Sequence, residues 1–198
     1  MRRKISAKAI LIPTISLFLI SLVVTALLAL TDNVTAKKIA ENEAQSKKES
    51  MFAVVPDAKD FDELEADVLY LGKDDSGNTV GYAISTSTQG YGGQVKVMTG
   101  IDTEGNIVGV DVFYNDDETP GLGKNTSNES FRDQYKGLSA YENIMVSKDF
   151  SSVVDDSTTG NTQTVDAVTS ATISSRAVTK AVNEACAIYA EYTEKEAK

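Results

Sequence analysis

The sequence predicts an α+β protein in which a single N-terminal transmembrane helix precedes a domain with an antiparallel sheet and flanking helices. Three observations support this prediction. Residues 9–31 form an uncharged, mostly apolar run; apolar and polar residues alternate in several segments between residues 66 and 114; and residues 174–192 have apolar positions spaced as on one face of a helix. The expected order is a basic tail over residues 1–8, a transmembrane helix over 9–31, a helical stalk over 32–50 and an extracytoplasmic domain over 51–198.

The apolar run is long enough to cross a bilayer. Its residues span about 34 Å as a helix, against a hydrocarbon core of about 30 Å. Arg2, Arg3, Lys4 and Lys8 precede it. By the positive-inside rule these residues stay in the cytoplasm, which predicts a single-pass protein of the cytoplasmic membrane with its C-terminal domain outside.

A cleaved signal peptide is the competing interpretation of this run. Val34, Thr35 and Ala36 loosely resemble a small-residue cleavage site. The run is well beyond the apolar length of about 7–15 residues found in signal peptides. A retained anchor is therefore the favoured interpretation.

Residues 32–50 are rich in Ala, Glu and Lys, which predicts a solvated helical stalk that ends near Pro56. Strands are expected over 66–71, 79–85, 94–101 and 107–114, with a hairpin turn over residues 102–106. A short helix is expected over 129–136, a polar loop over 155–164 and a closing helix over 174–192. Cys186 is expected to be a buried apolar residue of that last helix.

The composition excludes several classes of function. The net charge of -10 disfavours binding to nucleic acid. The chain contains no histidine, which excludes Ser-His-Asp triads, Cys-His pairs and His-based zinc sites built within it. The adjacent Asp155 and Asp156 lack the ligand spacing of a calcium loop, so no metal site is expected there.

Residues 166–175 read Asp-Ala-Val-Thr-Ser-Ala-Thr-Ile-Ser-Ser and place the Thr172 hydroxyl just before the expected closing helix. Small side chains let the backbone come close to a ligand, and the N–H groups of a helix start favour an anion. A helix N-cap that satisfies these N–H groups is the alternative interpretation, and the two are compatible.

A second loop, residues 118–123, reads Glu-Thr-Pro-Gly-Leu-Gly. Pro120 and Gly121 predict a tight turn, because Pro suits the second turn position and Gly the third. Between two expected strands, residues 89–93 contain three glycines, which indicates a turn or a close backbone approach.

The first loop resembles the flavinylation motif of FMN-binding domains in the G subunit of Rnf complexes and in the related C subunit of the sodium-translocating NADH:quinone reductase. In that motif an Asp precedes a Ser/Thr-Gly-Ala-Thr box whose last Thr carries FMN through a phosphoester. The resemblance implies that Thr172 carries the flavin. It assigns the rest of the box to Thr169, Ser170 and Ala171, and it gives Asp166 a role in transferase recognition or in positioning.

Ser170 departs from the family motif, which has Gly at this position. If the backbone has a positive φ there, a serine costs on the order of 1 kcal/mol. The second loop matches the family without a mismatch. The resemblance implies a flavin pocket in which Leu122 contacts the ring while Gly121 and Gly123 let the backbone approach. The same loop adds the following residues to the expected pocket: Glu118, Thr119 and Pro120.

The resemblance extends over the anchor and nearly the whole domain, including residues 89–93 and 131–137. It implies an electron-transfer subunit of a membrane ion-translocating ferredoxin:NAD oxidoreductase, the Rnf complex, with covalent FMN. Such a chain is not catalytic alone. Its implied partners are the other membrane and iron–sulfur subunits and a flavin transferase that acts during maturation.

Two alternatives stay open on the sequence. One is a free-standing, membrane-anchored flavoprotein that passes electrons to an extracytoplasmic acceptor. The other is an anchored binding module without flavin, which an acidic domain on a stalk fits equally well.

Overall fold

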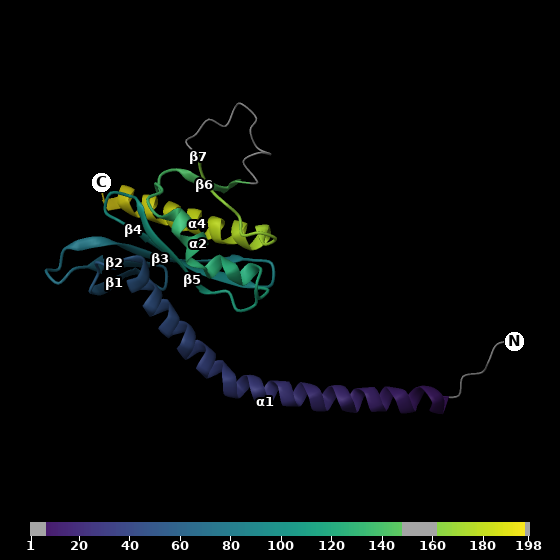
Figure 1. Cartoon of the computed structure of the whole chain (residues 1–198). Helices are drawn as coiled ribbons and strands as arrows, with labels where there is room; N and C mark the ends of the chain where they lie inside the picture. Colours follow the sequence, from purple (N-terminus) through teal and green to yellow (C-terminus); the bar gives the residue numbers. More distant parts are fainter. Residues whose placement is uncertain (1–6, 148–161, 197–198) are drawn as a thin grey trace. The chain divides into compact units, whose positions relative to one another are not determined.

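The computed structural model describes residues 7–147 and 162–196 of the chain (Figure 1). It divides into two compact units, Met1–Ala44 and Gln45–Lys198. The first unit consists of the larger part of α1, a helix of 48 residues over Ala7–Val54. Within the described residues α1 is the one helix long and apolar enough to cross a membrane, and none of its most apolar window is buried.

The expected stalk is the continuation of α1 rather than a separate helix. Pro56 follows its end by two residues, as predicted. One face of the helix end is buried, however, because Ser50, Met51 and Val54 pack against the sheet. A Cβ on Gly100 would lie 2.2 Å from the Val54 carbonyl oxygen, so glycine is needed where the helix end meets the sheet. The compact second unit accordingly begins at Gln45, ahead of the expected boundary at residue 51.

The second unit is built on a five-stranded antiparallel sheet in the order β1-β2-β3-β4-β5. Its strands are β1 (Asp60–Glu65), β2 (Leu69–Lys73), β3 (Thr79–Gln89), β4 (Gln94–Ile101) and β5 (Ile107–Tyr114). Alternate residues of a strand point to opposite faces of the sheet, and in β3 both sets of residues contact a helix. Ala83 packs with the end of α1, while Thr86 and Thr88 donate hydrogen bonds to carbonyl oxygens of the C-terminal helix at 3.0 and 2.7 Å.

The remaining elements pack around this sheet (Figure 1). They are the 3-10 helix η1 (Gly123–Ser127), α2 (Glu129–Arg132), the 3-10 helix η2 (Asp133–Tyr135), β6 (Asn143–Val146), β7 (Thr162–Val165) and α4 (Thr172–Glu196). β6 and β7 form a separate parallel pair. The predicted α+β class with an antiparallel sheet and flanking helices is confirmed.

Several elements match their predicted positions. β4 and β5 have the expected bounds, and the 102–106 hairpin turn closes through a 2.9 Å bond from the Asp102 N–H to the Asn106 carbonyl oxygen. α4 buries the predicted face, which consists of Val178, Ala181, Val182, Ala185 and Tyr189. Cys186 is buried in the same helix, as expected.

Other predictions were wrong at their edges. The strand expected over 66–71 starts at Leu69, because Asp67 adopts a positive φ of 62° in the turn that joins β1 to β2. β1 was missed because its sequence, Asp-Phe-Asp-Glu-Leu-Glu, lacks the alternation of apolar and polar residues that predicts a strand. The strand lies at the edge of the sheet, where most of its residues are exposed. Residues 162–164 of the expected polar loop belong to β7, whose pairing with β6 supplies their backbone partners. Residues 155–161 of that loop, including its two adjacent aspartates, lie outside the described residues.

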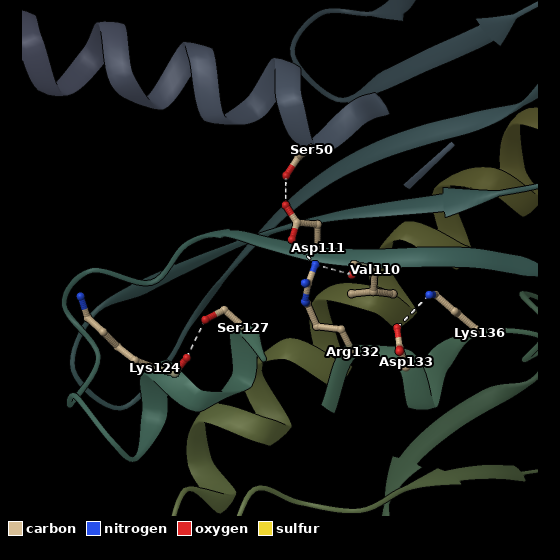
Figure 2. A network of polar contacts seen from close by, with 8 residues as sticks. All are labelled: Ser50, Val110, Asp111, Lys124, Ser127, Arg132, Asp133 and Lys136. Atoms are coloured by element: carbon tan, nitrogen blue, oxygen red, sulfur yellow. Dashed lines mark hydrogen bonds and ion pairs between the residues drawn. The ribbon is translucent and has the colours of Figure 1, made fainter. Parts of the chain in front are cut away.

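A polar network joins the end of α1 to β5 and α2 (Figure 2). The Ser50 hydroxyl donates to one carboxylate oxygen of Asp111, and the Arg132 guanidinium pairs with the other. Arg132 also donates to the Val110 carbonyl oxygen at 3.4 Å. Since Arg132 and Asp111 are both largely buried, this network holds three elements together next to the candidate site described below.

Candidate functional site

The two loops singled out in the sequence meet at one cavity of about 560 Å³. Thr172 and residues of the 118–123 loop both line it. The lining residues are Tyr91, Glu118, Thr119, Leu122, Gly123, Ser170, Ala171, Thr172, Ile173 and Ser174. A volume in this range is typical of small-molecule sites in proteins.

A second cavity, also of about 560 Å³, borders the first and shares Leu122 and Ser170 with it. Gly121, Asp166 and Thr169 line this second cavity. The other lining residues are Asn125, Asn128, Ser130, Phe131, Gln134, Ala167 and Val168. The predicted site residues are therefore divided between two adjoining cavities, and Pro120 lines neither.

The 118–123 loop contains the predicted turn. The Leu122 N–H donates to the Thr119 carbonyl oxygen at 3.1 Å, and Gly121 has a φ of 77°. A positive φ at the third turn position after a proline defines a type II turn, which glycine adopts without strain. This turn leaves the Leu122 side chain exposed at the edge of both cavities.

Thr172 is the first residue of α4 and not a residue that precedes the helix. The first i to i−4 bond of the helix runs from the Ser175 N–H to the Ala171 carbonyl oxygen at 2.9 Å, which makes Ala171 the N-cap. Because Ala171 occupies the N-cap position, the hydroxyl of Thr172 does not serve as the cap. Ala171 itself has no side-chain oxygen that could accept a bond from the first-turn N–H groups. The N–H groups of the first turn of a helix lack partners within that helix and favour an anion nearby.

Ser170 has a φ of 62°. The strained conformation that glycine would relieve is therefore present, at a cost on the order of 1 kcal/mol for a residue with a Cβ. The next residue is held by a turn, since the Ala171 N–H donates to the Val168 carbonyl oxygen at 3.0 Å. Ser170 thus turns the chain directly before the helix that carries Thr172.

Asp166 lies at the other end of this segment, where the Gln134 side chain forms two hydrogen bonds with its backbone. The Asp166 N–H donates to Gln134 Oε1 at 2.6 Å, and Gln134 Nε2 donates to the Asp166 carbonyl oxygen at 3.3 Å. The Asp166 carboxylate accepts a 2.8 Å bond from the Ser147 hydroxyl. Asp166 is exposed, so it lies where another protein can contact it.

Glu118 joins three parts of the site through its buried carboxylate. Oε1 accepts bonds from the N–H groups of Tyr91 at 2.7 Å and Gly92 at 3.3 Å, and Oε2 accepts a 2.7 Å bond from the Ser174 hydroxyl. The glycines of the 89–93 turn are needed here, since a Cβ on Gly90 would lie 2.1 Å from Glu118 Oε1. Glu118 therefore ties the β3–β4 turn to the first turn of α4.

Known proteins share the sequence pattern and the fold. A family model described as an FMN-binding domain matches residues 90–187, and one described as the RnfG N-terminal region matches residues 1–54. The chain is 36% identical over 192 residues to the G subunit of the Na(+)-translocating ferredoxin:NAD(+) oxidoreductase complex of Acetobacterium woodii, with 87% of this chain and 88% of that protein covered. The chain belongs to the G subunit family of Rnf ion-translocating oxidoreductase complexes.

Two further relatives agree with this assignment. The G subunit of the Proton-translocating ferredoxin:NAD(+) oxidoreductase complex of Clostridium ljungdahlii is 31% identical over 172 residues, covering 87% of this chain and 85% of its own. The G subunit of the Ion-translocating oxidoreductase complex of Methanosarcina acetivorans is 34% identical over 182 residues, which cover 86% of this chain and 89% of that protein.

A solved structure shows the same fold. The crystal structure of the C subunit of the Na(+)-translocating NADH-quinone reductase from Parabacteroides distasonis aligns with a TM-score of 0.59 and 17% identity. The alignment covers 80% of this chain and 95% of that one.

The residues around the first cavity fit the FMN after which this domain family is described. Outside α1, the large apolar side chains exposed among the described residues are Leu64, Tyr91, Leu122, Tyr141 and Ile173. Three of these, Tyr91, Leu122 and Ile173, line the cavity, where an aromatic ring system would cover them. The first turn of α4 supplies N–H donors for a phosphate.

Among the residues that the structure describes, no lysine or arginine lines either cavity of this Rnf subunit. Nor do the described residues contain a group of three or more His, Cys, Asp or Glu side chains placed to hold a metal ion. A phosphate in the first cavity would therefore be held by backbone N–H groups and hydroxyls, without a cationic side chain from the lining.

The sequence missed three lining residues of this cavity, or their role. Tyr91 lies inside the 89–93 segment, and its position as an aromatic residue among glycines was the available signal. Ile173 follows the flavinylation box directly. Ser174 is buried, and its hydroxyl donates to Glu118.

Proposed function

We propose that Thr172 carries FMN as a phosphoester and that this flavin relays electrons within a membrane-bound Rnf complex. The observation that supports the proposal is the position of Thr172. Thr172 opens a 25-residue helix and lines the same cavity as residues of the 118–123 loop.

Attachment transfers the FMN half of FAD to the protein. The Thr172 hydroxyl oxygen forms a bond to the flavin-side phosphorus, the pyrophosphate P–O bond breaks, and AMP leaves. A free threonine hydroxyl is a weak nucleophile, so the flavin transferase supplies the base that accepts its proton. Glu118 is not available for that role, because its carboxylate already accepts three hydrogen bonds within the protein.

The residues of this chain then hold the group in place. The first-turn N–H groups of α4 would bind the phosphoester, and the macrodipole of the helix would favour its negative charge. Leu122, Ile173 and Tyr91 would contact the ring, while Gln134 holds the Asp166 backbone at the start of the loop. When bound, FMN supplies the chemistry, since it accepts two electrons and releases them singly.

Covalent attachment suits a site without cationic side chains. Because no lysine or arginine from the described part of the chain lines the cavity, non-covalent affinity for the phosphate depends on backbone N–H groups and hydroxyls. The ester therefore retains the flavin on the extracytoplasmic side, where free FMN would be diluted. The basic residues ahead of α1 favour that side for the domain by the positive-inside rule.

The implied partners are the other membrane and iron–sulfur subunits of the complex. α1 anchors the chain among them, and the cavity edge at Tyr91, Leu122 and Ile173 is the exposed part nearest the flavin. The runner-up is a free-standing anchored flavoprotein. Purification of the tagged chain from its native membrane separates the two, because the free-standing form recovers no redox subunits.

The test is co-expression of the full chain with a flavin transferase, followed by denaturing electrophoresis. We expect a flavin-fluorescent band and an intact mass raised by one FMN less water. Thr172→Ala should abolish both signals, whereas Thr172→Ser keeps a hydroxyl at the same position and should retain them. A dark wild-type band in the presence of an active transferase would refute the proposal, and Thr169→Ala serves as the control for a nearby hydroxyl.

A further inference from the structure

Glu118 is the one Asp, Glu, Lys or Arg side chain that is buried among the described residues, with an exposed fraction of 2%. Burying a charge is unfavourable unless hydrogen bonds or an opposite charge compensate it. No ion pair to Glu118 is present in the part of the chain that the structure describes. Its compensation comes from two backbone N–H groups and one hydroxyl.

These partners surround both carboxylate oxygens. The two N–H groups donate to Oε1, and the Ser174 hydroxyl donates to Oε2. A carboxylate accepts at every one of these positions. The first turn of α4, with its positive dipole end, lies beside the same carboxylate and favours its negative charge.

Glu118 also lines the cavity that holds Thr172. A negative charge opposes the addition of electrons to a neighbouring group, and the effect grows where less water lies between the two. We propose that Glu118 is a positioning residue that lowers the reduction potential of the bound flavin and holds Tyr91 at the cavity edge. This inference rests on the proposed function, since it requires a flavin on Thr172.

Ser174 modulates the charge in the opposite sense. Its hydroxyl donates to Glu118 Oε2 and so draws part of the carboxylate charge away from the cavity. Loss of this donor leaves the carboxylate less compensated, which makes its field at the flavin more negative. The two substitutions Glu118→Gln and Ser174→Ala therefore shift the potential in opposite directions.

The experiment is a spectroelectrochemical titration of flavin-loaded full-length chain in mildly alkaline buffer, where carboxyl groups are ionised. Glu118→Gln should raise the potential by about 30 mV or more, which for a two-electron couple is a tenfold change in the reduction equilibrium. Ser174→Ala should lower it. Asp117→Asn removes the exposed carboxylate next in the chain and should change the equilibrium by roughly twofold or less, because water and salt screen it.

A second measurement separates charge from structure. Glutamine keeps Oε1 as the acceptor for the Tyr91 and Gly92 N–H groups, so hydrogen exchange of these two amides should stay slow in Glu118→Gln. A potential shift together with fast exchange at both amides would assign the effect to an opened turn and overturn the proposal.

The outcomes are distinguishable from a failure of the proposed function. Wild-type protein that takes up no flavin contradicts the assignment of Thr172. Loaded Glu118→Gln protein with an unchanged potential overturns the role of Glu118 alone. If Glu118→Gln fails to load, the Ser174→Ala protein decides the question: a lower potential supports the proposal, and an unchanged or higher one overturns it.

Discussion

Replacement of Ser170 by glycine tests whether the loop before Thr172 is strained. Ser170 has a φ of 62°, a conformation that costs about 1–2 kcal/mol for a residue with a Cβ. Glycine removes this cost, but it also gains freedom in the unfolded chain, which offsets about 0.4–1 kcal/mol. The expected net effect of Ser170→Gly is a rise of about 0.5 kcal/mol in the free energy of unfolding.

Two assays measure this effect. For a domain of this size, about 0.5 kcal/mol corresponds to a rise of about 1–2 °C in Tm. If the transferase acts on the loop in its left-handed conformation, the rate of flavin attachment should rise by roughly twofold as well, following the same free-energy difference. Both are measured on the full-length chain, the first by thermal unfolding and the second by the growth of flavin fluorescence over time.

Ser170→Ala is the matched control, because alanine keeps the Cβ and therefore the strain. It should leave both Tm and the attachment rate near their wild-type values. The reasoning is refuted if alanine stabilises the chain as much as glycine does, or if Ser170→Gly lowers Tm.

Three further predictions follow from packing, turns and burial. Arg132→Ala leaves the half-buried carboxylate on β5 without its cation and should cost about 2 kcal/mol in urea unfolding, whereas Lys136→Ala, which breaks an exposed pair, should cost under about 0.5 kcal/mol. Equal losses would contradict this. Gly92→Ala places a Cβ 1.9 Å from a backbone carbonyl oxygen and should reduce flavin loading about tenfold or more, while Gly77→Ala, with nothing within 4 Å, should load normally despite its φ of 80°. Burial raises the pKa of Cys186 to about 12, so the unfolded chain loses its thiol proton first and stability should fall as pH rises above about 8.5. Urea midpoints that do not fall over that range in wild type, relative to Cys186→Ala, would contradict the assignment.

The strands of the sheet differ in how well the alternation of apolar and polar residues predicts them. β4 and β5 were predicted at their observed bounds because they alternate in polarity and meet at an Asp-Gly turn signal. β1 has no such alternation, since it is an exposed edge strand that one neighbour alone pairs with. Its conformation follows from backbone hydrogen bonds to β2, which no local pattern encodes.

At the end of α1 the composition predicts the helix but not the burial of its last residues. Residues 32–50 have the composition of a solvated helix, and the helix is present. The burial of Val54 depends on Gly100 of β4 and that of Ser50 on Asp111 of β5, about fifty and sixty residues away in the chain. Packing of this kind is decided by the sheet as a whole.

At the site, the sequence by itself determined the apolar anchor, the turn at Pro120 and Gly121, the amphipathic α4 and the motif that singles out Thr172. These features depend on periodicity and on turn chemistry within a few residues, where backbone geometry is decisive. The tertiary structure alone decided that Thr172 lines the same cavity as residues of the 118–123 loop, and that Glu118 is buried with Ser174 rather than left free for a ligand. Such contacts join residues more than fifty positions apart, and they form only where packing of the sheet and α4 brings them together.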